Sequence, residues 1–291
     1  MNISIITASF PIDEETYNEV KALTEEASVL DGSPYLNMLN LFASRNPKSR
    51  GFFILAYDDT TNKLVGVIGA IDQIGLNTYE WSMLVDPMYR KIGIDEALLQ
   101  VLSEGLIQRE AEGELAIIIE TDRYGRKLLE KHGYSYSFSE ATFESKAEVS
   151  QPASEDLLIR QYNECDQESV IEILSEAFGD LREESVELID FNTTTEGIIL
   201  WVAEQNGQIV GTITSTKEGE VQWITALAVY LTVQGQGIGT ALLKWVKDFA
   251  FRNGDKKVML DVESENERAL GVYEKAGFSK AVQFDYFIYT G

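Results

Sequence analysis

The sequence predicts an α/β protein of two tandem domains, each a mixed β-sheet flanked by α-helices. Three observations lead to this class: an internal repeat, strand patterns that alternate with helix patterns, and hairpins between neighbouring strands. Alternating strands and helices are typical of α/β layers, and hairpins make such a sheet mixed instead of purely parallel. The length of 291 residues suits two domains of ordinary size.

The internal repeat appears when the chain is compared with itself at an offset of 144 positions, which sets Val233 on Tyr89. The segment 233–243 then falls on 89–99, and the segment 274–278 falls on 130–134. Two matching segments at one offset indicate a duplicated domain.

A linker separates the two copies. The stretch 147–156 is polar, contains a proline and has no apolar periodicity, as is typical of linkers. We therefore expect a first domain at 1–146, a linker at 147–156 and a second domain at 157–291.

Both halves show the same order of predicted elements. An opening strand precedes Glu-rich helical segments, a hairpin, a further strand, a glycine-containing loop, a long amphipathic helix, another strand and a short helix ending in glycine. Asn206-Gly207 between two apolar runs is a strong hairpin signal. In chain order the predicted strands are 3–7, 52–57, 64–70, 79–85, 115–119, 157–161, 198–203, 209–215, 221–229, 258–262 and 284–289.

The charge balance bears on the partners. The chain carries 48 Asp and Glu against 24 Lys and Arg, a net charge of −24, and neither half is basic. Nucleic acid is therefore not an expected partner, because it requires a basic surface. The acidic surface either attracts cationic substrates such as amines or only keeps the protein soluble.

Cysteine and histidine are too few for several kinds of site. Cys165 is the single cysteine and His132 the single histidine, so we expect neither a disulfide framework nor a metal site. There is no apolar run of 18 residues, so we expect no membrane span. The opening segment 1–6 resembles a strand more than a signal peptide, and we expect a cytoplasmic protein.

The loop Gln234–Gly239 is the strongest candidate for chemistry. It lies between a predicted strand ending at Val229 and a helix starting near Thr240, and a helix start favours an anion through its free N–H groups and dipole. Its three glycines let the backbone approach a phosphate closely, or alternatively serve only the packing of the turn. It lacks the Lys-Ser/Thr of a P-loop and the third Gly or Ala of a dinucleotide fingerprint.

This loop resembles the Gln/Arg-x-x-Gly-x-Gly/Ala signature of the GNAT superfamily of acetyltransferases, the acyl-CoA N-acyltransferase fold. A second element of that family, Asn-x-x-Ala-x-x-x-Tyr-x-x-x-Gly-Phe, is intact at Asn266–Phe278. The resemblance covers the whole second half, with both elements in the family's order. The layout is also similar to tandem members with one degenerate half, such as those of the mycothiol synthase type.

The resemblance implies acetyl-CoA as cofactor and transfer of its acetyl group to a primary amine of a small molecule or peptide, in a ternary complex. The loop amides would bind the pyrophosphate, and the preceding strand would hydrogen-bond the pantetheine arm as an added strand does. The implied cofactor-binding residues are Leu227, Val229, Gln234, Gly235, Gln236, Gly237, Ile238, Gly239, Thr240, Asn266 and Ala269.

Two residues are candidates for catalysis. By resemblance, Tyr273 would protonate the departing thiolate; a thiol has a pKa of about 8.5 and a tyrosine about 10, so this transfer needs little driving force. The alternative for Tyr273 is a core aromatic residue. Glu220, with Glu218 behind it, is the candidate base for the amine, and the alternative is a solvated glutamate of a turn.

The first half differs from the second at three of these positions. Asp95 stands where the second half has Gly239, Asp122 where it has Asn266, and Leu129 where it has Tyr273. We expect Asp95 to cap the helix N-terminus and repel phosphate. The first half is therefore predicted to lack acetyl transfer and coenzyme A binding.

Other functions remain open. A non-catalytic acyl-CoA sensor would use the same loop, and a peptide or scaffold module is a third alternative. The amine, the role of the first half and the choice between monomer and homodimer do not follow from the sequence.

Overall fold

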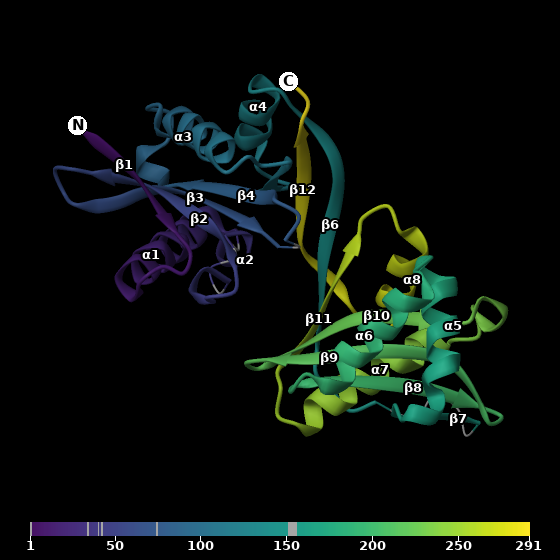
Figure 1. Cartoon of the computed structure of the whole chain (residues 1–291). Coiled ribbons are helices and arrows are strands. Elements are labelled where there is room, and N and C mark those ends of the chain that lie inside the picture. The colour runs from purple at the N-terminus through teal and green to yellow at the C-terminus, as the bar shows by residue number, and fades with distance from the viewer. Residues whose placement is uncertain (1, 34, 40, 42, 74, 151–155) are drawn as a thin grey trace. The chain divides into compact units, whose positions relative to one another are not determined.

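The computed structural model describes residues 2–33, 35–39, 41, 43–73, 75–150 and 156–291. They form two compact units, one of residues 1–139 and 282–291 and the other of residues 140–281. Each unit is a mixed sheet with helices on both faces, so the predicted fold class is confirmed (Figure 1). Residues 151–155 of the predicted linker lie outside the described residues. In the described part of the chain, no helix is long and apolar enough to cross a membrane.

The first unit has the strand order β1-β2-β3-β4-β5-β12, antiparallel except for the parallel pair β4–β5. Its helices α1 and α2 cover one face of the sheet, and α3 and α4 cover the other (Figure 1). The elements are β1 (Ile3–Ser9), α1 (Glu14–Asp31), α2 (Tyr35–Met38), η1 (Ala43–Arg45), β2 (Arg50–Asp58), β3 (Lys63–Asp72), β4 (Thr78–Val85), η2 (Pro87–Tyr89), α3 (Ile94–Gln108), β5 (Gly113–Ile119) and α4 (Arg123–Lys131).

The alternation of side chains along β2 explains why both faces are covered. Phe52 and Ile54 pack into the core that contains α3, whereas Phe53 and Leu55 pack into the core that contains α1. Successive residues of a strand point to opposite faces, so a continuous apolar run needs helices on both sides.

The second unit repeats this arrangement with the strand order β6-β11-β10-β9-β8-β7 and one parallel pair, β10–β11. Helices α5 and α6 cover one face, and α7 and α8 the other (Figure 1). The elements are β7 (Leu157–Gln161), η3 (Glu164–Asp166), α5 (Gln167–Phe178), α6 (Arg182–Thr194), β8 (Ile198–Gln205), β9 (Gln208–Glu218), β10 (Val221–Val229), η4 (Leu231–Val233), α7 (Ile238–Arg252), β11 (Lys257–Glu263) and α8 (Glu267–Lys275).

Two strands are exchanged between the halves of the sequence. Strand β12 (Ser279–Tyr289) follows α8 in the chain but pairs with β5 of the first unit, from Phe284 opposite Ile119 to Ile288 opposite Leu115. Strand β6 (Tyr134–Lys146) begins in the first unit, and its residues 140–146 pair with β11 of the second. The units therefore differ from the predicted ranges 1–146 and 157–291, which follow chain order.

Strand β6 itself was not among the predicted strands, although Tyr134-Ser135-Tyr136-Ser137-Phe138 alternates in the manner of a strand. The predicted strand at 284–289 is present, in a different unit from the one expected. Periodicity reveals which face a residue takes, but it does not reveal which strand lies alongside.

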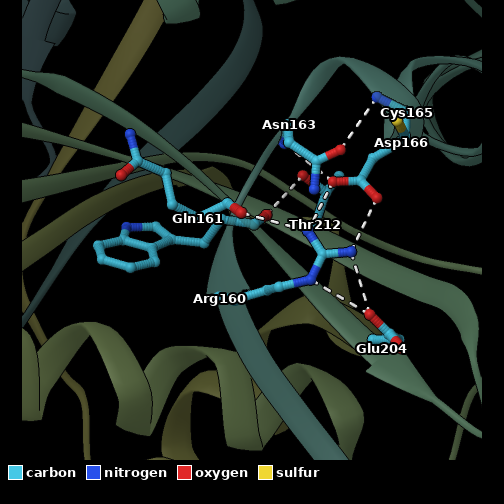
Figure 2. Close-up of polar contacts among 8 residues, drawn as sticks. Arg160, Gln161, Asn163, Cys165, Asp166, Glu204 and Thr212 are labelled. Carbon is cyan, nitrogen blue, oxygen red and sulfur yellow. Dashed lines mark hydrogen bonds and ion pairs between the residues drawn. The ribbon is translucent and has the colours of Figure 1, made fainter.

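A polar network in the second unit holds β7 to the start of α5 (Figure 2). Arg160 on β7 donates to both carboxylate oxygens of Asp166, at 2.7 and 2.8 Å, and to Glu204 on β8, at 3.0 and 3.2 Å. Asp166 is buried and also accepts the N–H of Asn163 at 2.9 Å. Arg160 lowers the pKa of Asp166 below its usual range. This network fixes the helix whose last residue, Phe178, lines the cavity described below.

We expect the exchanged strand to stabilise the first unit. Phe287 is fully buried in the core of that unit, so Phe287→Ala should cost about 3–5 kcal/mol. Hydrogen exchange should show lost protection in β4 and β5 and little change in β8 and β9. Ile288→Ala, at a 42% exposed position of the same strand, is the control and should have a small effect. Loss of protection confined to the second unit would contradict the strand exchange.

The Arg160–Asp166 pair should stabilise the second unit in a pH-dependent way. Asp166→Asn should lower the free energy of unfolding at pH 7 by about 1.5–3 kcal/mol, the usual contribution of hydrogen bonds to charged groups. Because the folded pKa of Asp166 is lowered, its contribution is complete above the ordinary pKa of about 3.9 and decreases as pH falls below that value. Urea unfolding of both proteins across this range should show the difference shrinking at acid pH.

The matched control is Glu168→Gln. Glu168 accepts two hydrogen bonds from Arg182, at 2.6 and 2.7 Å, but both side chains are mostly exposed. An exposed pair contributes about 0–1 kcal/mol, so this variant should change stability little. Equal losses in both variants would contradict the role given to burial.

Candidate functional site

Strand β10 has different neighbours along its two edges. On one edge it pairs with β9 almost to its end, with an irregularity between Thr225 and Ala228, where Ala226 has a φ of 48°. On the other edge its parallel pairing with β11 stops at Ile224 opposite Leu260. In the described register, residues 225–229 of β10 therefore have no strand partner on that edge. On that edge the backbone of Leu227 and the N–H of Val229 can pair with an extended ligand.

The glycine loop follows this strand after η4. Gln234 donates from Nε2 to the Val229 carbonyl at 2.8 Å, which closes the loop against the end of β10. Gly235 and Gly237 have φ values of 81° and 86°, in the left-handed region that favours glycine. The other amide atom of Gln234, Oε1, is buried and has no hydrogen-bond partner among the described residues.

Helix α7 begins at this loop with free donors. Gly237 is its N-cap residue and offers no side-chain cap, and Ala241 N–H donates to the Gly237 carbonyl at 2.9 Å. The N–H groups of Ile238, Gly239 and Thr240 in the first turn precede that bond and lack intrahelical acceptors, as at any helix start. Together with the helix dipole they form a favourable position for an anion.

A cavity of about 430 Å³ lies beside this helix start. It collects most of the predicted cofactor residues and one predicted catalytic residue. Those that line it are Leu227, Val229, Gln234, Gly235, Gly237, Ile238, Gly239, Thr240, Asn266, Ala269 and Tyr273. Gln236 belongs to the same loop, but it is not among the lining residues, and its side chain is exposed.

Asn266 has a structural task at the edge of the cavity. Its Oδ1 accepts the N–H of Ala269 at 3.1 Å and so caps α8. Because this oxygen serves the helix, a hydrogen bond from Asn266 to a ligand would be donated by Nδ2.

Tyr273 lines the cavity from α8 and is half-buried. Its ring lies 6.2 Å from that of Phe143 and 6.4 Å from that of Phe278, centroid to centroid. Burial raises the pKa of Tyr273, so its hydroxyl keeps its proton at neutral pH. A protonated phenol at the cavity wall can act as a general acid.

Glu220 is not brought to this cavity. It precedes β10, at the opposite end of a nine-residue strand from the glycine loop, which at about 3.3 Å per residue is a long separation. Its side chain is 65% exposed and pairs with Lys256 at 2.5 Å. Glu220 is close in sequence to β10, but it lies at the start of this strand, whereas the glycine loop follows its end.

Several lining residues were not predicted. Phe178 and Ala177 come from the end of α5, and Leu231 and Val233 from η4. Arg268 and Lys275 of α8 add two cations, and no described residue forms an ion pair with either. Arg268 and Lys275 are seven residues apart on α8, so they lie on the same side of the helix as Ala269 and Val272. The helical pattern alone could therefore have indicated both cations. No local pattern identifies Phe178, because its position depends on how α5 packs.

The corresponding place in the first unit is occupied by the protein itself. Asp95 is 5% exposed and accepts a hydrogen bond from the hydroxyl of Tyr124, whose pKa this bond raises to about 12. At the offset of 144, Asp95 matches Gly239 and Tyr124 matches Arg268, both of which line the cavity of the second unit. Arg90 matches Gln234 and likewise donates to the end of its strand, to Val85 O at 3.0 Å.

The expected capping role of Asp95 is wrong in detail. The N-cap residue of α3 is Gly93, with a φ of 90° and no side-chain cap bond, and the helix begins at Ile94. Asp95 is thus the second helical residue, too late to serve as the N-cap. Its carboxylate occupies the space near the helix start by bonding Tyr124 instead.

Two parts of the chain, residues 15–134 and 167–278, match the Acetyltransferase (GNAT) family. The human protein N-acetyltransferase 8B is 34% identical over 94 residues, which are 30% of this chain and 41% of that protein. The matched region spans less than half the length of the curated relatives that it resembles.

Two solved structures have the same fold over nearly the whole chain. A GCN5-related N-acetyltransferase from Sphaerobacter thermophilus has a TM-score of 0.76 at 20% identity, covering 98% of this chain and 95% of its own. A tandem GNAT protein from the clavulanic acid biosynthesis pathway has a TM-score of 0.72 at 15% identity, covering 98% of each chain. At these identities the likeness establishes the fold alone.

Proposed function

Because the chain belongs to the acetyltransferase (GNAT) family, with a match in each half, we propose that its second unit transfers an acetyl group from acetyl-CoA to a primary amine of a small molecule or peptide. The observation that carries this proposal is the cavity of the second unit. It joins an uncapped helix start, an unpaired strand edge and the hydroxyl-bearing Tyr273.

The residues present suit a long polyanionic ligand of this kind. The N–H groups of Ile238 to Thr240 would bind the pyrophosphate, and Arg268 and Lys275 would offset the repulsion from an acidic protein. The unpaired edge at Leu227 and Val229 would hold the pantetheine arm, whose amides form hydrogen bonds as a strand does. The orphaned acceptor Oε1 of Gln234 is a further buried group that a ligand donor would satisfy.

When bound, acetyl-CoA supplies the acetyl group as a thioester. The residues of the cavity would orient that thioester beside Tyr273, and close positioning of two reactants is itself a large contribution to catalysis. Tyr273 would hold its proton until the sulfur departs as a thiolate and would then donate it. Its raised pKa ensures that the acid is in the correct form before the reaction.

The alternative is a non-catalytic acyl-CoA-binding sensor or regulatory protein. It is favoured by the chemistry of the cavity lining, which in the described part of the chain contains no Asp, Glu or His to act as a base. The first unit is proposed to lack both cofactor binding and catalysis in either case, because Asp95 and Tyr124 occupy the helix start. The proposed setting is cytoplasmic.

Binding should occur at one site per chain. Calorimetry with acetyl-CoA should give a stoichiometry of one, and Gly239→Asp should abolish it because the new carboxylate would face the phosphates. Gly271→Asp is the charge-matched control, since Gly271 lies on α8 with open space around it and outside the cavity lining. Two sites per chain, or equal losses in both variants, would refute the assignment.

Turnover should depend on Tyr273. Release of free thiol, followed over a panel of polyamines, amino acids, aminoglycosides and peptide N-termini, should identify an acceptor. With that acceptor, Tyr273→Phe should lower kcat by about 10²–10⁴-fold with little change in KM. Tyr162→Phe, outside the cavity, should be neutral. Silence of the native protein across the panel, with acetyl-CoA bound, would favour the sensor.

A further inference from the structure

The cavity lacks a base, but a carboxylate lies where β10 and β11 part. The parallel pairing of these strands ends at Ile224 opposite Leu260, and Asp261 is the next residue of β11. After Ile224, the pairing of β10 with β9 shifts register between Thr225 and Ala228. Asp261 is therefore the first residue of β11 beyond its pairing with β10.

Asp261 faces away from α7. Val258, Leu260 and Val262 pack into the core that contains α7, so the alternation along β11 turns Asp261 to the other face of the sheet. On that face α5 and α6 pack against β8, β9 and β10. Asp261 is exposed on this face, so a ligand can reach it.

The register links Asp261 to Tyr273 across the sheet. Tyr273 contacts Phe143 of β6, Phe143 is opposite Leu260 of β11, and the next pair along is Thr142 with Asp261. Phe143 belongs to the core on the α7 face, and Thr142 turns to the opposite face. Phe143, whose ring contacts Tyr273, and Thr142, which is opposite Asp261, are thus neighbouring residues of β6 whose side chains take opposite faces.

The carboxylate is held in place by a hydroxyl. Thr142 is buried and donates from Oγ1 to Oδ1 of Asp261 at 2.5 Å, which leaves Oδ2 for a ligand. Burial raises the pKa of Asp261, and the Thr142 hydroxyl partly opposes this. Part of the residue is exposed to solvent. The surrounding protein still removes enough water from the carboxylate for this effect on the pKa to exceed that of the Thr142 hydrogen bond. A raised pKa makes a carboxylate a better base.

The charges on this face around Asp261 are mixed, because Lys146 and Lys257 take the same face as three glutamates by the same alternation. Glu140 and Glu144 flank Thr142 on β6, and Glu263 follows on β11; Glu144 is paired with Lys257 at 2.6 Å. On β10 the same alternation places Trp223 and Thr225 on the face that carries Asp261. Neither side chain titrates as an acid or base in the neutral range. The carboxylates beside Asp261 favour a protonated amine over an anionic ligand.

We infer that Asp261, positioned by Thr142, binds a protonated aliphatic amine and takes its proton, from the face of the sheet opposite Tyr273. This rests on the proposed function. Once neutral, the amine nitrogen bonds the thioester carbonyl carbon as the C–S bond breaks. The nitrogen loses its second proton to water, Tyr273 donates a proton to the sulfur, and exchange with solvent restores both side chains. No electron is gained or lost.

The central test is Asp261→Asn, assayed with an aliphatic amine and with an arylamine that is already neutral at pH 7. For the aliphatic amine, kcat/KM should fall by about 10²-fold or more, and the acid limb of its pH profile should disappear. For the arylamine the loss should be within about threefold, since it has no first proton to give. Affinity for acetyl-CoA, measured by calorimetry, should be unchanged, which also verifies folding.

A second readout needs no turnover. Carboxyl ¹³C NMR of the ligand-free chain follows the titration of Asp261 directly, and Thr142→Val should move its midpoint to higher pH, because a hydrogen bond to the charged form is lost. The acid limb of kcat/KM should move in the same direction. A midpoint that stays in place in Thr142→Val would overturn the positioning role.

The control is Glu263→Gln, which removes a carboxylate from the same strand and face but without the Thr142 contact. It should change kcat/KM little. Equal losses in the two variants, or an acid limb that survives in Asp261→Asn, would overturn the inference while leaving the proposed function intact. A native protein that binds acetyl-CoA and acetylates no amine would refute the proposed function, and the base with it.

Discussion

The second unit depends on how β10 divides its hydrogen bonds. One edge pairs with β9 nearly throughout, while the other pairs with β11 over only four residues before the strands part. The unpaired edge leaves a place for an extended ligand, and the loop after β10 brings the start of α7 beside it. An uninterrupted β10–β11 ladder would remove that edge.

The duplicated sequence shows the same scaffold with and without an open helix start. In both units a left-handed glycine precedes the helix, and a long side chain bonds the end of the preceding strand, Gln234 in one and Arg90 in the other. At the helix start the two units differ by Gly239 and Arg268 against Asp95 and Tyr124, and further along the cavity by Asn266 and Tyr273 against Asp122 and Leu129. In the first unit the Asp95–Tyr124 hydrogen bond stands where the second unit has lining residues of the cavity. The scaffold is therefore separable from the ligand site.

The glycine loop and the order of the elements could be predicted from the sequence, and the physical reason differs between the two. Spaced glycines before an amphipathic helix imply an uncapped helix start, and Gly235 and Gly237 do adopt the conformations that require glycine. The order of the elements followed from periodicity. The strand exchange did not, because alternation along 284–289 is the same whichever strand lies beside it. Nearness in sequence suggests Glu220, but the candidate site lies at the far end of the strand that follows this residue. Asp261 cannot be singled out from the sequence, because its position depends on register with β6, which no local pattern contains.

The exchanged strands also bear on how such a chain is made and inherited. Residues 282–291 leave the ribosome long after the rest of the first sheet, so that sheet waits unfinished while the second half is synthesised. The second sheet in turn takes residues 140–146, including Ala141 and Phe143 of its core, from the end of the first copy. A gene cut at the linker would leave each product short of a strand. Deletion of the first half would therefore also remove a strand from the sheet that carries the candidate site.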